Sequence, residues 1–342
     1  MKILILRFSS LGDIAMATAL PRHLRKRFPD AQIDIAVRED YKELVEWNPY
    51  LNDKLYVARH DGFCGLWKLT KEIRRRKYDL IIDAHRSIRS SFVCMLNPFV
   101  KKVYFNKRTF KRLVLIFFKL NLFKKVDLQI VEYLKPLSKL GISYDGLGTE
   151  IFVPSKINNK VSEMLNTMIP TMGTKVLVGI VPSAQHPGKR WPVDKFMGLT
   201  RILSEKIDCN IVIVGGGKDS FCDEIAAVAG NAYSLAGKVS MIESAVALSL
   251  CDVVVANDTG MMHVAEAVGT DVIGIMGPTS YELGCYPYRS TSRVVELDMW
   301  CRPCSKNGKG PCIMLGKRPC LNCITPDMVF DEVVDYFKVR DN

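Results

Sequence analysis

The chain has 342 residues, of which 48% are hydrophobic and 25% charged, and its formal net charge is +12. This length exceeds one average domain, so we expect two domains, and the apolar content excludes a mainly disordered chain. The most apolar stretch, 113–123, is interrupted by Lys119 and is shorter than the roughly 20 residues of a membrane-spanning helix, which argues against an integral membrane protein.

Short apolar runs alternate with helical patterns along the first half of the chain, an order typical of parallel sheets covered by helices. The predicted strands are 2–7, 32–37, 54–58 and 80–84, and the predicted helices are 13–28, 40–47, 66–76 and 128–140. Three glycines and a proline in 141–154 indicate a boundary between domains.

The second half repeats this plan. The predicted strands are 176–181, 210–214, 253–256 and 272–276, and the predicted helices are 193–206, 219–229, 242–250, 261–268 and 326–339. We therefore predict an α/β fold of two Rossmann-like, doubly wound domains that face a central cleft, over 1–155 and 156–325, followed by a C-terminal helix in 326–342. Ligands of such sheets bind beyond the carboxyl ends of the strands, which directs attention to the loops there.

The loop after the first predicted strand contains Ser9, Ser10, Gly12 and Asp13. Gly12 suits a tight turn, and Asp13 at the start of a helix is either an N-cap, the commoner use, or a base for an incoming hydroxyl. No glycine-rich phosphate loop occurs here, so a nucleotide is not expected on this half.

Three loops of the second half suit a diphosphate. Lys189 and Arg190 follow a strand and precede a helix, where they would hold an anion. Amides at the start of the helix after Asp258 offer a second phosphate contact, and the loop 277–280 ends the next strand in the same way. His263 on that helix is either a ligand or a buried core histidine. The candidate donor-site residues are Ser183, Lys189, Asp258, Thr259, Gly260, His263, Gly277 and Thr279.

These residues resemble the glycosyltransferase family 9 heptosyltransferases, over nearly the whole chain. The matching motifs are RFSSLGD at 7–13, YDLIID at 78–83, KRWP at 189–192, LAGK at 235–238 and NDTGMMHVA at 257–265 with GPT at 277–279. The resemblance implies a GT-B fold, an ADP-heptose donor on the C-terminal domain and a lipid-linked sugar acceptor of the lipopolysaccharide inner core on the N-terminal domain.

The resemblance also assigns roles. Asp13 matches the general base of the family, and Lys189 matches the lysine that binds the donor phosphates. We find no Asp-x-Asp pair, which fits an inverting reaction that needs no metal cofactor. The alternative within the class is a family 9 enzyme that uses another nucleotide sugar or another glycan acceptor.

The sequence departs from the family after Asp83. Where the family often has a Gln-Gly pair, this chain has His85 and Arg86, followed by Arg89. We take these three residues, with Ser9, Ser10 and Gly12, as the candidate acceptor site, and the change puts the identity of the acceptor in doubt.

Nine basic residues and no acidic residue lie in the segment 98–126. One interpretation is a solvated basic face; the other is contact with something anionic. Apolar residues at 114–118 favour a membrane surface over a nucleic-acid groove, so we expect no nucleic-acid partner. A basic, zinc-containing nucleic-acid-binding module remains the alternative from another class, and it predicts strongly salt-dependent binding.

Eleven cysteines and no recognisable export signal predict a cytoplasmic protein, peripheral at the inner face of the inner membrane. Four of them have the spacing of a structural zinc site, namely Cys301, Cys304, Cys320 and Cys323, with Cys312 between the pairs. The alternative is a set of reduced or partly oxidised thiols, and neither interpretation gives them a catalytic role.

Overall fold

The computed structural model describes residues 1–340, which form two compact units. Unit 1 comprises 1–108 and 127–152, and unit 2 comprises 109–126 and the described residues from 153 onward. The last two residues of the predicted C-terminal segment, 341–342, lie outside the described residues. The predicted boundary at 155 lies close to the third and last passage of the chain between the units, after Phe152. The predicted division differs in two respects, because 109–126 belongs with unit 2 and the C-terminal helix is an integral part of that unit.

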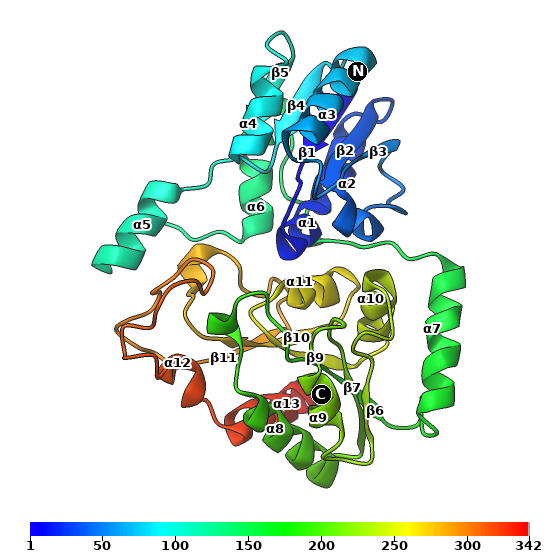
Figure 1. The fold of residues 1–342 in the computed structure, drawn as a ribbon, viewed down its shortest axis with the longest axis vertical. Coiled ribbons are helices and arrows are strands. Elements are labelled where there is room, and N and C mark those ends of the chain that lie inside the picture. The colour runs from blue at the N-terminus through cyan, green and yellow to red at the C-terminus, as the bar shows by residue number, and fades with distance from the viewer. Residues whose placement is uncertain (341–342) are drawn as a thin grey trace. The chain divides into compact units, whose positions relative to one another are not determined.

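Unit 1 is built on a five-stranded parallel sheet of order β3-β2-β1-β4-β5 (Figure 1). Its strands are β1 (Lys2–Leu6), β2 (Gln32–Arg38), β3 (Asp53–Val57), β4 (Leu80–Asp83) and β5 (Lys101–Tyr104). Its helices are α1 (Leu11–Ala17), α2 (Ala19–Arg27), η1 (Glu39–Leu44), α3 (Gly62–Arg76), α4 (Ile88–Met95), α6 (Gln129–Leu134) and η2 (Lys135–Leu140).

Two predicted helices are divided in unit 1, and both contain a proline. The predicted helix 13–28 is interrupted at Thr18, ahead of Pro21, and the predicted helix 128–140 changes to 3₁₀ geometry at Lys135, ahead of Pro136. Proline lacks the N–H that the helical ladder requires, so each ladder breaks close to it. The predicted helix 40–47 is the 3₁₀ helix η1.

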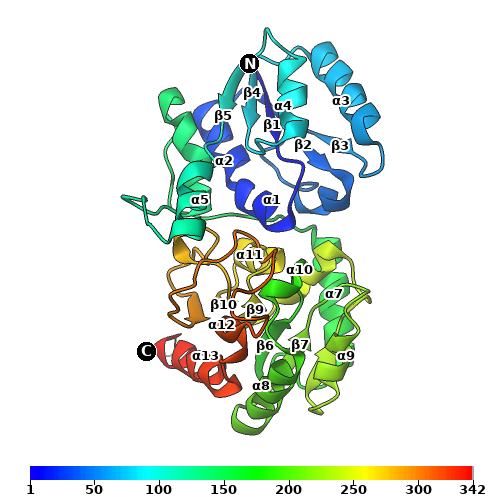
Figure 2. The same ribbon diagram turned by 60° about the vertical axis from the view of Figure 1, so that its left-hand side comes forward.

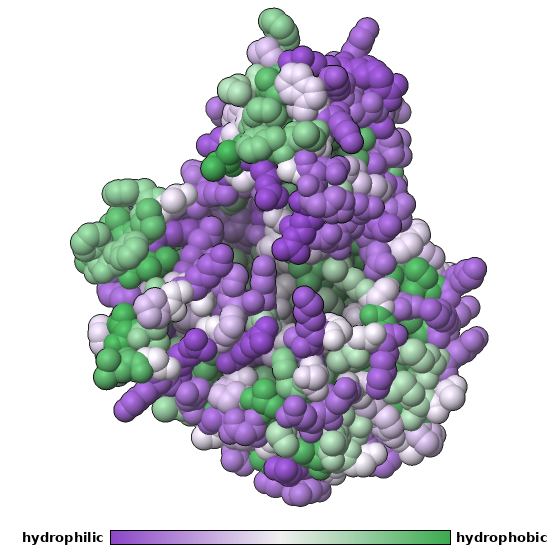
Figure 3. Space-filling view, viewed as in Figure 1, coloured by the Kyte–Doolittle hydropathy of each residue, from purple (hydrophilic) through white to green (hydrophobic). Residues whose placement is uncertain are grey.

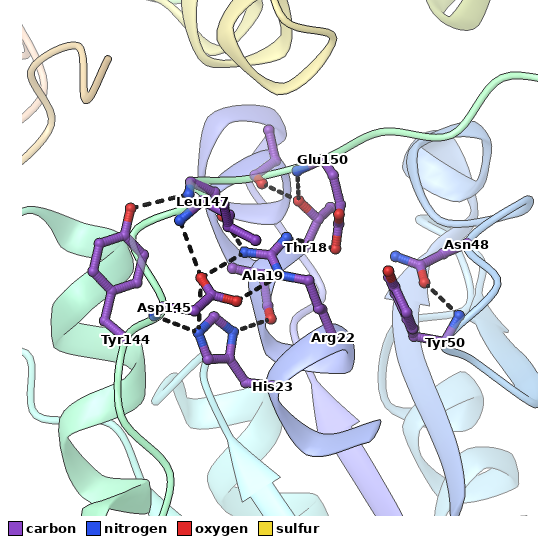
Figure 4. Close-up of polar contacts among 12 residues, drawn as sticks. Thr18, Ala19, Arg22, His23, Asn48, Tyr50, Tyr144, Asp145, Leu147 and Glu150 are labelled. Atoms are coloured by element: carbon purple, nitrogen blue, oxygen red, sulfur yellow. Dashed lines mark hydrogen bonds and ion pairs between the residues drawn. The ribbon is translucent and has the colours of Figure 1, made fainter. Parts of the chain in front are cut away.

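The last segment of unit 1, 144–150, is fastened to α1 and α2 by a buried polar cluster (Figure 4). Arg22 donates from Nε and Nη2 to the two carboxylate oxygens of Asp145 at 2.9 and 3.0 Å, and its Nη1 lies 2.7 Å from Glu150 Oε1. The Thr18 hydroxyl accepts the Glu150 N–H at 3.1 Å. Burial opposes ionisation of Asp145, but the hydrogen bonds from Arg22 lower its pKa. This cluster therefore holds the last segment of unit 1 against its first two helices.

Unit 2 contains a six-stranded parallel sheet of order β11-β10-β9-β6-β7-β8. Its strands are β6 (Val176–Val181), β7 (Cys209–Ile213), β8 (Ala232–Ser234), β9 (Val253–Asn257), β10 (Val272–Met276) and β11 (Arg293–Glu296). Its helices are α5 (Thr109–Phe118), α7 (Ser155–Met168), η3 (Pro187–Lys189), α8 (Val193–Lys206), α9 (Phe221–Ala226), α10 (Met241–Ser249), α11 (Gly260–Ala267), η4 (Tyr281–Leu283), α12 (Pro319–Asn322) and α13 (Pro326–Arg340).

Both faces of this sheet are buried, which explains the continuous apolar runs of its strands. Along β9, Val253 and Val255 join the core under α8, α9 and α13, whereas Val254 and Ala256 join the core under α7, α10 and α11. Helices α8 and α13 pack side by side (Figure 2). The doubly wound architecture predicted from the sequence is confirmed.

Candidate functional site

The strand order of unit 1 reverses between β1 and β4. In an open parallel sheet, the carboxyl ends of the strands beside such a reversal are the usual place for a ligand. Asp13 follows β1, and His85 and Arg86 follow β4. The structure therefore brings the candidate acceptor residues of two distant sequence segments to one edge of the sheet.

Asp13 lies at the centre of a polar network. Its Oδ2 is 2.5 Å from Arg7 Nη2 and accepts the Ser10 hydroxyl at 2.9 Å, and its Oδ1 accepts the Tyr133 hydroxyl at 3.2 Å. The Arg7 side chain is 6% exposed, whereas that of Asp13 is 34% exposed and within reach of a ligand. Burial would lower the pKa of Arg7, but the charge and hydrogen bond of Asp13, together with Tyr133 and Asp83, raise it.

The structure refines the prediction for this loop. Ser10 is the N-cap of α1 and its backbone N–H donates to Asp13 Oδ2 at 3.4 Å, so Asp13 does support the helix start. Gly12 lies buried inside α1 and is not among the residues of positive φ, so the expected tight turn at Gly12 is wrong. Tyr133, which no motif indicated, holds both Asp13 and, with its ring 5.6 Å from the guanidinium, Arg7.

Asp83 braces the loop that carries the acceptor candidates. Its fully buried carboxylate accepts the N–H groups of His85 and Arg86 at 3.0 and 2.7 Å, and the Ser90 hydroxyl at 3.0 Å. Asp83 is therefore a positioning residue, which explains the acid at the end of the predicted strand.

His85 is held neutral. Burial, followed by the positive charges of Arg7 and Lys107, lowers the pKa of His85 to about 3. Its ring packs edge-on against Phe8 with centroids 5.5 Å apart. A neutral imidazole beside the Asp13 network can orient a hydroxyl by hydrogen bonding without competing for its proton.

Arg86 has φ +51°, in the left-handed region that favours glycine. This is the position where the family often has glycine, so arginine is retained here at a conformational cost. Its guanidinium lies 4.7 Å from the Tyr104 ring centroid and lines a surface hollow of about 300 Å³ with Lys102. Arg89 is exposed on α4.

In unit 2 the strand order reverses between β6 and β9, and the loops after these strands carry the predicted donor site. Lys189 Nζ lies 2.6 Å from Asp258 Oδ2, and the Thr279 hydroxyl donates to the same oxygen at 2.7 Å. Asp258 and Thr279 are buried, whereas the Lys189 side chain is 14% exposed. Asp258 and Thr279 therefore hold Lys189, which is the group of the three that a ligand reaches.

Helix α11 begins beside this lysine. Thr259 is its N-cap and makes no side-chain capping hydrogen bond, and Thr259 and Gly260 are partly exposed. The unsatisfied N–H groups there attract an anion. His263 is 4% exposed and faces Glu266, with Nδ1 3.8 Å from Oε2, so it belongs to the interior of the unit as the alternative interpretation expected.

Ser183 is connected to a turn that the sequence analysis missed. Its hydroxyl donates to Asp219 Oδ2 at 2.6 Å, and the same oxygen accepts the Gly216 N–H at 2.8 Å. This turn follows β7, next to β6 in the sheet. Three consecutive glycines at 215–217 after a predicted strand are the signal that could have indicated it.

Gly277 has a packing reason for lacking a side chain. A Cβ there would lie 2.6 Å from Leu321 Cγ, so glycine allows α12 to pack against the end of β10. A donor contact at Gly277 stays a prediction. Asn257, the first residue of the NDTGMMHVA motif, has a structural role: it accepts the Trp191 N–H at 3.0 Å and donates to the Pro182 carbonyl at 2.6 Å, which fixes the loop that presents Lys189.

The cysteines that lie near one another are not the same four that the zinc prediction names. Burial raises the pKa of Cys320 to about 11, and the neighbouring thiols Cys304, Cys301 and Cys312 act on it in the same direction, whereas Cys323 is exposed. Within residues 1–340, no three His, Cys, Asp or Glu side chains are placed to hold a metal ion. The structure therefore gives the zinc site no support, and zinc binding stays a prediction.

The basic segment 98–126 is divided between the units after Arg108. Several of its cations have internal partners: Lys102 donates to the Val100 carbonyl at 2.8 Å, and Arg112 donates to the Leu283 carbonyl at 2.9 Å. Lys102 and Arg112 are therefore partly engaged within the protein, and membrane contact through this segment stays a prediction. No helix in the described part of the chain is long and apolar enough to cross a membrane.

Two successive doubly wound units, each with a polar site where its strand order reverses, have the architecture of a GT-B glycosyltransferase. Solved structures agree. A glycosyl transferase family 9 protein from Veillonella parvula matches with a TM-score of 0.80 at 21% identity, covering 98% of this chain and 96% of that one. The E. coli ADP-heptose lps heptosyltransferase II matches with a TM-score of 0.74 at 23% identity, over the full length of both chains.

Sequence comparison gives the family. The model of glycosyltransferase family 9 (heptosyltransferase) matches residues 66–311. Lipopolysaccharide heptosyltransferase 2 of E. coli K12 is 25% identical over 315 residues, covering 87% of this chain and 88% of that protein. Lipooligosaccharide heptosyltransferase 2 of Campylobacter jejuni is 23% identical and covers 99% of both. The chain belongs to glycosyltransferase family 9.

Proposed function

We propose that this enzyme transfers heptose from ADP-heptose to an acceptor of the lipopolysaccharide inner core, with inversion at the anomeric carbon. The observation that carries the proposal is the Lys189–Asp258 pair beside the open start of α11, at the strand reversal of unit 2. Solved E. coli heptosyltransferase WaaC holds ADP and an ADP-heptose analogue, which supports an ADP-sugar as the donor.

The donor diphosphate binds to Lys189 and to the amides of Thr259 and Gly260. As the bond between the sugar and the diphosphate breaks, negative charge grows on the departing ADP, and these groups neutralise it. Asp258 and Thr279 keep the lysine in place, so little reorganisation is needed during the reaction. Because the leaving group has these protein partners and the sequence has no Asp-x-Asp pair, we propose a reaction that needs no metal ion.

Asp13 acts on the acceptor. Its carboxylate takes the proton of the acceptor hydroxyl as that oxygen attacks the anomeric carbon of heptose, a form of assistance typically worth about 10²–10⁴-fold. Arg7, Ser10 and Tyr133 orient the carboxylate. Ser9, His85, Arg86 and Arg89 line the acceptor side, and the cations suit an acceptor that carries phosphate.

The acceptor of this reaction is a lipid, so we place the enzyme at the cytoplasmic face of the inner membrane, in peripheral contact through the basic segment 98–126. The exposed Lys111 and Lys124 of this segment, together with its exposed phenylalanines, support that contact.

A panel of nucleotide sugars with a phosphorylated inner-core acceptor tests the proposal by mass spectrometry of the acceptor. Addition of one heptose with ADP-heptose, and no product with UDP-hexoses, is the expected result. Product formed with another nucleotide sugar instead favours the second candidate, a family 9 enzyme with a different donor. Because the His85–Arg86 pair departs from the family, other glycan acceptors should be tested in the same assay.

A further inference from the structure

A second basic, acid-free segment lies in unit 2, far from 98–126 in sequence. Residues 299–326 contain five cations and no acid. The cations are Arg302, Lys306, Lys309, Lys317 and Arg318. The three lysines are exposed. Arg302 is occupied internally by Glu296 at 2.5 Å and contributes nothing to an outer charge.

The structure joins this segment to the first one. Lys119, which follows α5, donates from Nζ to the carbonyls of Cys301 and Pro303 at 2.9 and 2.7 Å. Asn121 donates to Glu282 Oε1 at 3.3 Å, and Arg112 to the Leu283 carbonyl. Segment 109–122 is therefore attached to unit 2 along its length, and its outer side lies beside the start of 299–326.

Large apolar side chains are exposed on both segments. On the first, Phe110, Phe117 and Phe118 are each more than 70% exposed, with Leu113, Leu120 and Leu122 also exposed. On the second, Trp300 and Leu315 are 72% and 90% exposed, and Ile313, two residues before Leu315, is also exposed. Figure 3 shows one hydrophobic patch over α5 and another below it, over the loop drawn orange in Figure 1, with hydrophilic residues around them.

We infer that loop 299–318 and segment 109–124 together form one docking surface for an anionic lipid membrane. This inference rests on the proposed function and extends its membrane contact to a second, unpredicted segment. Exposed phenylalanine, tryptophan and leucine enter the interfacial region of a bilayer, and lysines around them pair with lipid phosphates. A second protein copy fits less well, because surfaces of the same positive sign repel each other.

Vesicle co-sedimentation tests the inference. Wild-type enzyme is mixed with vesicles of phosphatidylcholine containing phosphatidylglycerol and, separately, with phosphatidylcholine alone. We expect binding to the anionic vesicles and at least tenfold weaker binding after either Phe117→Glu or Leu315→Glu, because each places a charge where an apolar group enters the bilayer. Lys309→Ala should weaken binding about fivefold, the value of one lysine near such a surface.

Val339→Glu is the matched control, since Val339 is 64% exposed on α13 of the same unit and should leave vesicle binding unchanged. Circular dichroism checks that every variant is folded. Loss of binding with Phe117→Glu but not with Leu315→Glu overturns the two-segment surface and leaves contact through α5 alone. A lipid-free dimer that Leu315→Glu dissociates, measured by sedimentation, also overturns it and assigns the patch to a second copy.

Heptose transfer to a water-soluble, delipidated acceptor separates this inference from the proposed function. Phe117→Glu and Leu315→Glu should turn over that acceptor like wild type and lose activity only on acceptor embedded in anionic vesicles. Wild-type enzyme that transfers heptose but does not bind vesicles refutes the surface while supporting the chemistry; absence of transfer from wild type refutes the chemistry, whatever the vesicles show.

Discussion

Lys189 and Asp258 form a 2.6 Å ion pair at the point where the strand order of unit 2 reverses. Asp258 is 4% exposed and is also bonded by Thr279, so the lysine is oriented before any ligand arrives. A cation that is already oriented loses less freedom on binding, which makes it a good partner for a diphosphate.

Lys189→Ala should weaken ADP binding by at least tenfold, because it removes the cation that pairs with the diphosphate. Asp258→Asn should weaken it less, since it removes only the acid that holds the lysine in position. Calorimetric titration with ADP measures both. Lys175→Ala is the control, because Lys175 forms a similar 2.6 Å pair with Asp208 outside the site. Equal affinity of wild type and Lys189→Ala would contradict the assignment.

His85 should make folding stability depend on pH. Its pKa is about 3 in the folded protein, whereas in the unfolded chain it is near 6.5. Below about pH 6.5 the unfolded chain takes up a proton that the folded protein refuses, so this contribution to stability is intact above that pH and is lost as pH falls toward 3. Denaturant unfolding measures this. Between about pH 7 and pH 4.5, the free energy of unfolding of wild type should fall by about 2–3 kcal/mol more than that of His85→Gln. Parallel curves would show that the imidazole titrates normally.

Arg86 allows backbone strain and side-chain chemistry to be separated. Arg86→Gly and Arg86→Ala both remove the guanidinium, but only glycine relieves φ +51°. The glycine variant should therefore be more stable than the alanine variant by about 1 kcal/mol. Both should raise KM for a phosphorylated acceptor and leave ADP affinity unchanged. If the two variants unfold at the same denaturant concentration, the left-handed conformation carries no cost.

The thiols should differ in reactivity in a way that also tests zinc binding. Burial raises the pKa of Cys304 and Cys320, so their reactive thiolates are scarce at neutral pH, whereas Cys323 and Cys64 are exposed. Mass spectrometry after brief alkylation should find Cys64 and Cys323 modified first. Bound zinc would instead protect Cys323 together with Cys301, Cys304 and Cys320, and metal analysis of the same sample would find about one zinc per chain.

The elements that sequence predicts well are those that local pattern determines. The β-branched runs that became β6, β7, β9 and β10 are buried on both faces, so their composition alone identifies them. Segment 109–118 was not assigned as a helix, since four of its seven apolar residues are exposed and its inner side is set by distant carbonyls such as Leu283.

The residues of the candidate site also divide into those that a local motif indicates and those that only folding brings together. Motifs indicate Asp13, Lys189 and Asp258, because these positions lie where strands end. They do not indicate Tyr133 or Asp219, whose contacts depend on segments brought together only by folding. Nor does the sequence reveal that Arg86 occupies a left-handed conformation or that Gly277 is required by Leu321.

The most direct test of the proposed reaction is steady-state heptose transfer from ADP-heptose by wild type, Asp13→Asn and the control Asp30→Asn, whose carboxylate is exposed elsewhere in unit 1. We expect wild type and Asp30→Asn to be equally active, and Asp13→Asn to lose about 10²–10⁴-fold in kcat while binding ADP normally. Transfer by Asp13→Asn at the wild-type rate, or no transfer from ADP-heptose by wild type, would contradict the account.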